Sequence, residues 1–146
     1  MTRANRTRWR CSSVGWLTGI CLATVPLVNP YIRGDGNGYY AYIRSAVIDR
    51  DLKFENEYSR GDPAFVASVF GPDGHLSPGL SLGDGYVRNQ WSVGPSILWA
   101  PHFLLGHGLA RSLSGLGWGI APDGYSLPYR GLCALGTAIY AFVALI

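Results

Sequence analysis

The chain has 146 residues, about one domain, and it is poor in charge for a soluble protein. Charged residues make up 14%, against roughly 25% in soluble globular proteins, whereas the hydrophobic class reaches 48%. These values argue against an ordinary soluble enzyme. An aromatic content of 13% without long blocks of like charge argues against disorder and against nucleic-acid binding. We therefore expect an all-α membrane protein that has the lipid bilayer, and no nucleic acid, as a partner.

The net charge of +3 is distributed unevenly along the chain. Four arginines lie within the first ten residues, whereas residues 33–91 carry six basic and eight acidic residues. Because positive charge before a membrane span stays in the cytoplasm, residues 1–13 are expected to form a cytoplasmic N-terminus. The chain after residue 32 is then expected outside the cytoplasm.

The first apolar stretch has no charge between Arg10 and Arg33 and predicts a transmembrane helix over residues 14–32. A crossing helix needs about 20 mostly apolar residues, which this stretch supplies. A signal peptide has the same basic start and apolar centre. No small-residue cleavage site follows the stretch, so we favour an uncleaved membrane helix.

Residues 33–130 are predicted to form an extracytoplasmic loop, and its first part contains a short amphipathic helix. Apolar residues recur at helical spacing over about 38–50 and leave Arg44, Ser45 and Asp49 on the opposite, polar face. Tyrosines favour the headgroup level of a bilayer, so we expect this helix to lie on the membrane surface.

The rest of that loop divides into an irregular part and a second helix. Residues 59–91 are rich in glycine and proline, which predicts an irregular loop with little room for a packed core. An uncharged stretch over about 93–110 is apolar but is interrupted by prolines, glycines and two histidines. Polar groups at mid-depth in a bilayer are costly, so we expect this helix to lie along the membrane interface.

Residues 131–146 are rich in Ala, Leu, Ile, Val and Phe and predict a second transmembrane helix that is truncated by the end of the chain. We therefore expect the N-terminal fragment of a multi-pass protein of the cell membrane.

The candidate chemistry lies just after the first predicted span, at Asp35. Two interpretations remain open: Asp35 caps the following helix, or it acts at the water–lipid boundary as a general base or as a ligand for a divalent cation. The nearby acidic residues Asp49, Asp51, Glu55 and Glu57 could also bind a cation, but a solvated loop face is the interpretation we favour. No metal site is predicted from the cysteines and histidines. The triplets Arg33-Gly34-Asp35 and Arg60-Gly61-Asp62 arise readily in a glycine-rich loop, and we assign them no role.

Several motifs resemble those of GT-C membrane glycosyltransferases, especially the bacterial relatives of protein mannosyltransferases and aminoarabinose transferases. The similar segments are Gly34-Asp35-Gly36-Asn37-Gly38-Tyr39-Tyr40-Ala41-Tyr42 with Asp49-Arg50-Asp51-Leu52, then Gly94-Pro95-Ser96-Ile97-Leu98-Trp99-Ala100-Pro101, and Asp123-Gly124-Tyr125 to Arg130. The first resembles the start of the family's first loop, and the second resembles its second juxtamembrane helix. The third resembles the segment that leads into the next span.

The resemblance implies transfer of a sugar from a polyprenyl-phosphate donor to an extracytoplasmic acceptor. Asp35 matches the catalytic acidic residue, and the resemblance places Asn37, Tyr39, Tyr40 and Arg44 in substrate binding. The second acidic residue found in many relatives is replaced by Gly36, and this segment alone is expected to be inactive. The alternative is a non-catalytic membrane-anchored binding or assembly protein, or an inactive remnant of such an enzyme.

Overall fold

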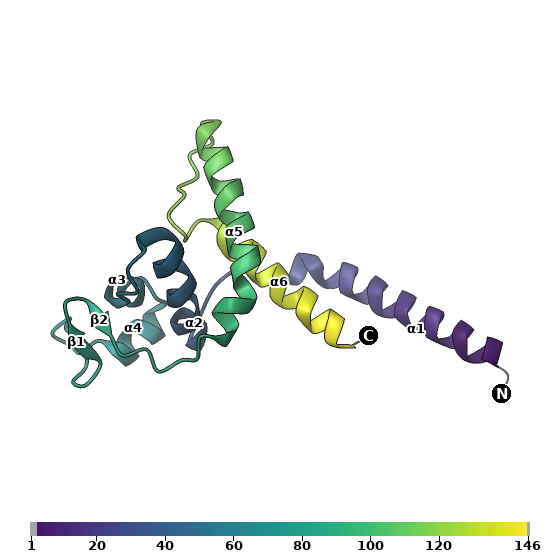
Figure 1. Ribbon diagram of the computed structural model, residues 1–146, viewed down its shortest axis with the longest axis horizontal. Coiled ribbons are helices and arrows are strands. Elements are labelled where there is room, and N and C mark those ends of the chain that lie inside the picture. Colours follow the sequence, from purple (N-terminus) through teal and green to yellow (C-terminus); the bar gives the residue numbers. More distant parts are fainter. Residues whose placement is uncertain (1–2, 146) are drawn as a thin grey trace.

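The computed structural model describes the backbone of residues 3–145 and the side chains of residues 13–145. The described chain is mostly helical, which confirms the predicted class of secondary structure, and Figure 1 shows its arrangement. The elements in chain order are α1 (Arg3–Thr24), a 3₁₀ turn (Val25–Leu27), α2 (Asp35–Arg44), a π-helical turn (Ser45–Asp49), α3 (Glu55–Ser59), α4 (Pro63–Val69), β1 (Ser81–Gly83), β2 (Tyr86–Val87), α5 (Gly94–Gly115) and α6 (Leu127–Leu145). The two strands pair antiparallel, with Ser81 opposite Val87 and Gly83 opposite Tyr86.

Helix α2 is the centre of a folded body that also contains α3, α4 and the hairpin (Figure 1). One side of α2 contributes Tyr40 and Ile43 to a hydrophobic cluster with α5 and α6. The other side contributes Ala41 to a second cluster, formed with residues from α3, α4 and β2. The predicted polar face is wrong in part, because Arg44 and Ser45 are 6% and 0% exposed. A helix with protein on both sides cannot present a polar face to water.

The second cluster corrects the prediction of an irregular loop over 59–91. It consists of Ala41, Phe54, Tyr58, Phe65, Val69 and Val87, with Trp91 packed against it. Helix α4 begins cleanly because Asp62 caps it: its Oδ1 accepts hydrogen bonds from the backbone N–H groups of Ala64 and Phe65. Pro63 occupies the first helical turn, where no N–H donor is needed. The aromatic residues of the second cluster pack edge to face. They form a hydrophobic core in a segment whose glycine and proline content does not predict one.

Helices α5 and α6 pack closely because glycine lies at two of their contacts. A Cβ atom on Gly106 would lie 2.8 Å from the Cα of Tyr129, and one on Gly136 would lie 2.6 Å from the ring of His102. Helix α5 continues through Pro101 and ends at Gly115, five residues beyond the predicted helix. Glycines that look like interruptions in the sequence therefore serve as contact surfaces.

The first predicted span is helical over only part of its length. The helix ends with the turn at Leu27, and the chain is extended from Val28 because Pro30 disfavours helical geometry at Asn29. The apolar helical stretch Ser13–Leu27 is shorter than a full crossing, whereas Leu127–Leu145 is 19 residues long and sufficiently apolar to cross a membrane. Only 17% of its apolar window is buried in the protein, unlike the core helix of a soluble domain.

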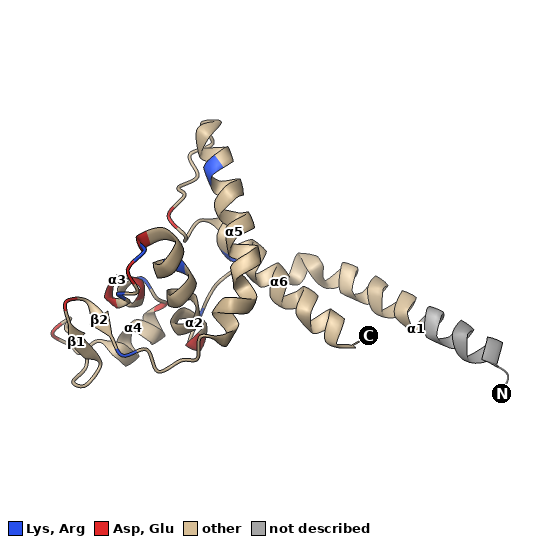
Figure 2. Cartoon of the chain, viewed as in Figure 1, with Lys and Arg blue, Asp and Glu red and all other residues tan. Residues whose placement is uncertain are grey.

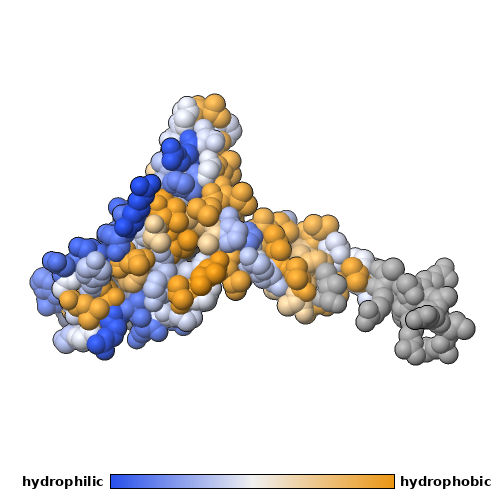
Figure 3. All heavy atoms as spheres, in the orientation of Figure 1, coloured by the Kyte–Doolittle hydropathy of each residue, from blue (hydrophilic) through white to orange (hydrophobic). Residues whose placement is uncertain are grey.

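Charge separates the folded body from the two projecting helices. Figure 2 shows acidic and basic residues on the body and a basic residue, Arg111, on α5, whereas residues 13–24 of α1 and the part of α6 after Arg130 carry no charge. The space-filling view in Figure 3 shows the same division, with a hydrophilic surface on the body and a hydrophobic surface along the projection. The polar folded body and the apolar helices meet at the chain segment 28–34 and the start of α6.

Candidate functional site

A pocket of about 790 Å³ lies where the folded body meets the apolar helices. Its wall combines the extended segment after α1, one side of α2, the α3–α4 turn and the start of α6. The lining residues are Tyr31, Ile32, Arg33, Asn37, Tyr40, Ala41, Glu57, Arg60, Gly61, Asp62, Pro63, Ala64, Tyr125 and Arg130. Its volume lies in the range of small-molecule sites, about 300–1,000 Å³.

Three arginines in this wall have aromatic rather than acidic neighbours. Arg33 and Arg130 lie over the ring of Tyr31, at 5.8 and 5.2 Å from its centre, and Arg60 lies 5.2 Å from the centre of the Tyr125 ring. Among the described residues, the ion pairs involve Arg44 alone. The guanidinium groups of Arg33, Arg60 and Arg130 are therefore oriented by cation–π contacts and stay available to an anion.

The glycine turn before α2 is fixed by Asp62 from the opposite side of the pocket. One Asp62 oxygen, Oδ2, accepts hydrogen bonds from the Gly34 N–H and from Asn37 Nδ2, each at 2.8 Å. The backbone bond from Gly34, together with the bond from Asn37 and the α4 cap, lowers the pKa of Asp62 below its ordinary value. The two Arg-Gly-Asp triplets thus meet through a hydrogen bond and form one rim of the pocket.

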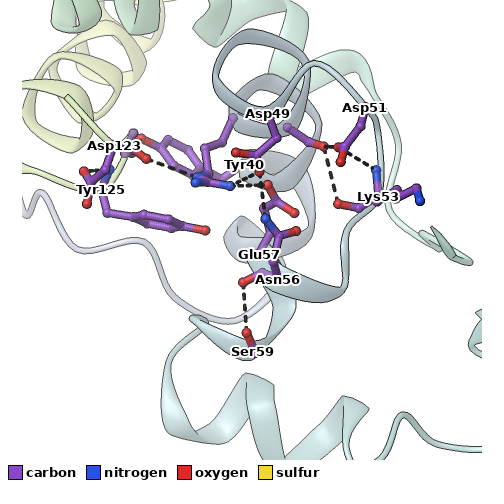
Figure 4. Close-up of polar contacts among 12 residues, drawn as sticks. Tyr40, Asp49, Asp51, Lys53, Asn56, Glu57, Ser59, Asp123 and Tyr125 are labelled. Atoms are coloured by element: carbon purple, nitrogen blue, oxygen red, sulfur yellow. Dashed lines mark hydrogen bonds and ion pairs between the residues drawn. The ribbon is translucent and has the colours of Figure 1, made fainter. Parts of the chain in front are cut away.

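Behind the pocket, Arg44 is held between two carboxylates. Its Nη1 donates to Glu57 Oε1 at 2.6 Å and also to Asp49 Oδ2, its Nε donates to the carbonyl of Asp123, and Figure 4 shows Asp49, Glu57 and Asp123 converging there. Burial raises the pKa of Glu57 to about 7, although the charge and hydrogen bond of Arg44 oppose that change. Asp49 is less buried, and bonds from Asn56 and Arg44 outweigh its desolvation and lower its pKa. One guanidinium cannot neutralise two carboxylates, so the more buried one holds its proton more tightly.

Three buried polar atoms of residues that line the pocket have no hydrogen-bond partner among the described residues. They are Glu57 Oε2, the hydroxyl of Tyr125 and Arg130 Nε. Burial also raises the pKa of Tyr125 to about 12, so its hydroxyl remains a donor at neutral pH. One acceptor and two donors without partners in one wall favour a polar ligand, because unpaired buried polar groups are destabilising.

A smaller apolar groove of about 270 Å³ continues from the pocket along α6. The two cavities share Tyr31, Ile32, Arg33 and Arg130. The remaining lining residues are Val28, Asn29, Pro30, Gly36, Trp99, Cys133, Ala134 and Thr137. A ligand with a charged head and an apolar tail could therefore occupy both spaces at once.

The structure brings together only part of the predicted site. Asn37 and Tyr40 line the pocket, whereas Tyr39 and Arg44 do not. Tyr39 offers its carbonyl to Ser96, and Arg44 is occupied by Asp49 and Glu57.

Asp35 also lies outside the pocket wall, at the exposed first residue of α2. No side-chain hydrogen bond caps that helix, so the structure does not give Asp35 the capping role that the sequence left open.

Two pocket residues were misinterpreted in the sequence. The sequence predicts a solvated acidic face that includes Glu57, and this prediction is wrong, because Glu57 is 5% exposed and paired with Arg44. A local signal exists, because Phe54 and Tyr58 are four residues apart and both belong to the core, and Glu57 is buried next to Tyr58 whereas Glu55 and Asn56 are exposed. Arg60 belongs to an Arg-Gly-Asp triplet that has no evident role in the sequence, and only the tertiary fold shows that Arg60, Arg33 and Arg130 share a pocket.

Metal ligands are not grouped in this part of the molecule. Among the described residues, no three His, Cys, Asp or Glu side chains could hold a metal ion together. In the acidic cluster, the Arg44 guanidinium takes the position between Asp49 and Glu57 that a cation would need.

Comparison with protein families, with curated proteins and with solved structures found no match. The functional argument therefore depends on the geometry of the pocket and the groove.

Proposed function

We propose that the chain binds a polyprenyl-phosphate-linked sugar at the membrane boundary, as the N-terminal part of a GT-C-like glycosyltransferase that acts on an extracytoplasmic acceptor. The observation that carries this proposal is the union of an arginine-lined pocket with an apolar groove at one junction. A lipid-linked phosphate has both the charge and the apolar tail that this union would accommodate.

The charge of the pocket favours a phosphate. Among the lining residues, Arg33, Arg60 and Arg130 contribute three positive charges, whereas Asp62 and Glu57 contribute at most two negative charges. The pair of carboxylates behind the wall is engaged by Arg44. Guanidinium groups match the geometry of phosphate oxygens and are more easily desolvated than lysine ammonium groups, which suits a pocket beside an apolar groove.

The apolar helices support a location at a bilayer. In our proposal α6 crosses the membrane, the apolar part of α1 enters it with the N-terminus in the cytoplasm, and the folded body lies outside. Helix α5 would lie along the interface through exposed leucines such as Leu98, Leu105 and Leu109. The pocket would then open at headgroup level, where the phosphate of a lipid carrier lies.

Binding of farnesyl phosphate to the purified full chain in nanodiscs tests the proposal directly. We expect saturable binding that farnesol, which lacks the phosphate, does not compete. Arg60→Gln should weaken binding by about tenfold or more, because a charge-assisted hydrogen bond is lost. Arg88→Gln is the matched control, since Arg88 is exposed and lies outside the pocket and the groove. Equal affinity for farnesol and farnesyl phosphate would contradict the proposal.

The position of Asp35 favours a second candidate, a non-catalytic membrane-anchored binding protein. The carboxylate expected to be catalytic is exposed and outside the pocket wall, so the pocket could bind a lipid-linked phosphate without transferring it. The two candidates differ in turnover. Sugar transfer by membranes that contain the full-length protein supports the enzyme, and ligand binding without transfer supports the binding protein.

A further inference from the structure

Glu57 presents an acceptor that the fold itself does not use. Its side chain is 3% exposed and lines the pocket, and its Oε1 is fixed by the hydrogen bond from Arg44. Its Oε2 is buried and has no partner among the described residues. A carboxylate held by one oxygen leaves the other in a defined orientation, ready to accept a hydrogen bond.

Neither Arg44 nor Arg60 bonds to this oxygen. The hydrogen bonds of Arg44 go to Glu57 Oε1, Asp49 and the Asp123 carbonyl, and none goes to Glu57 Oε2. Arg60 lies over the Tyr125 ring and forms no ion pair with Glu57. The ionised carboxylate would repel a phosphate, so a neutral hydroxyl donor suits Oε2 better than the phosphate of the ligand does.

We infer that Glu57 Oε2 accepts a hydrogen bond from a hydroxyl of the sugar in the lipid-linked ligand, while the arginines hold its phosphate. This inference rests on the proposed function and adds the residue that distinguishes a glycosylated carrier from the bare carrier phosphate. The free hydroxyl of Tyr125, in the same wall, supplies a donor for a second sugar oxygen. Sugar hydroxyls both donate and accept, which matches this pair.

Glu57→Gln tests the inference with little change of shape. Its amide oxygen would face Arg44, because the amide nitrogen cannot accept from a guanidinium. The amide NH₂ then replaces the acceptor Oε2 with a donor. Asp49→Asn is the matched control, since Asp49 is the other carboxylate on Arg44 but does not line the pocket.

The probes are farnesyl phosphate and farnesyl phosphate that carries glucose, mannose or arabinose, each titrated against the full chain in nanodiscs at pH 8. We expect Glu57→Gln to weaken binding of the preferred glycosylated probe by at least about tenfold, whereas farnesyl phosphate should bind as tightly as before or more tightly, because a repelling charge is lost. Asp49→Asn should change neither affinity by more than about twofold. Thermal unfolding of each variant verifies that it is folded.

The outcomes separate the two proposals. If the wild-type protein binds farnesyl phosphate but no glycosylated probe more tightly, the inference about Glu57 is wrong and the proposed function survives. Equal loss of both probes in Glu57→Gln, or no loss, also overturns the inference. If the wild-type protein binds neither kind of probe, the proposed function fails and this inference fails with it.

Discussion

The buried carboxylate of Glu57 should make the stability of the folded body depend on pH. Burial raises its pKa to about 7 in the folded protein, against an ordinary value of 4.5. A group whose folded-state pKa is raised contributes stability that is complete below pH 4.5 and is lost as the pH rises through 7. That pKa difference corresponds to about 3 kcal/mol, at about 1.4 kcal/mol for each pH unit.

Glu57→Gln should remove this dependence, because glutamine resembles the protonated acid at every pH. We expect the free energy of unfolding of the variant, minus that of the wild type, to increase by about 3 kcal/mol between pH 5 and pH 8. Asp49 has a lowered pKa and contributes stability that is lost only at more acidic pH, below this window.

The measurement is urea unfolding in detergent, followed by the fluorescence of tryptophan, since Trp91 packs against Tyr58 and Phe65 in the body. Trp91→Phe in both backgrounds identifies the part of the signal that reports this body. A difference between variant and wild type that stays constant from pH 5 to pH 8 would refute the reasoning. It would mean that Arg44 keeps Glu57 ionised throughout.

Two further predictions concern packing and topology. Gly106→Ala should destabilise the protein by about 1–3 kcal/mol, because the added Cβ meets backbone atoms of α6. Gly108→Ala, in open space on the same helix, is the control and should stabilise the protein by up to about 1 kcal/mol. Equal effects of the two substitutions in thermal unfolding would contradict the close α5–α6 contact. Ser81→Cys should react with a membrane-impermeant thiol reagent in intact cells, relative to the unsubstituted protein, and protection from the reagent until the cells are lysed would contradict the proposed orientation.

The sequence predicts α2, α5 and α6 because helical periodicity and apolar length are local properties. Helix α2 begins at Asp35, three residues before the predicted start, and its turn ends at Asp49. Its burial could not be predicted in the same way. The periodicity shows one apolar stripe. On the other side of the helix, Ala41 belongs to the second cluster and Gly38 lies against Trp91, and residues as small as these do not add a second apolar stripe to the sequence pattern.

The pocket was still less accessible to prediction, because its members are brought together by tertiary packing. Arg33 and Arg130 are far apart in the chain and share one ring, that of Tyr31, only after α6 has packed beside the extended segment. Asn37 and Tyr40 both line the pocket because they share one side of α2, and their role in substrate binding stays a prediction. Glu57 and Arg60 were not, since an acidic or basic residue in a glycine-rich segment is most often solvated.

The proposed catalytic role of Asp35 can be tested with one more substitution. Asp35 is exposed, has no side-chain hydrogen bond and interacts with the N-terminus of α2 only through its charge in the first turn. Asp35→Asn should therefore change stability by about 0.5 kcal/mol or less. If Asp35 is the general base, sugar transfer by membranes with the full-length protein should fall about 100-fold. Asp84→Asn, an exposed Asp-Gly turn outside the pocket, is the control. Transfer near the wild-type rate would remove Asp35 from the chemistry. Glu57 would then be the one acidic side chain in the pocket wall without a full set of hydrogen-bond partners. The other acidic residue of the wall, Asp62, is already bonded to Gly34, Asn37 and the start of α4.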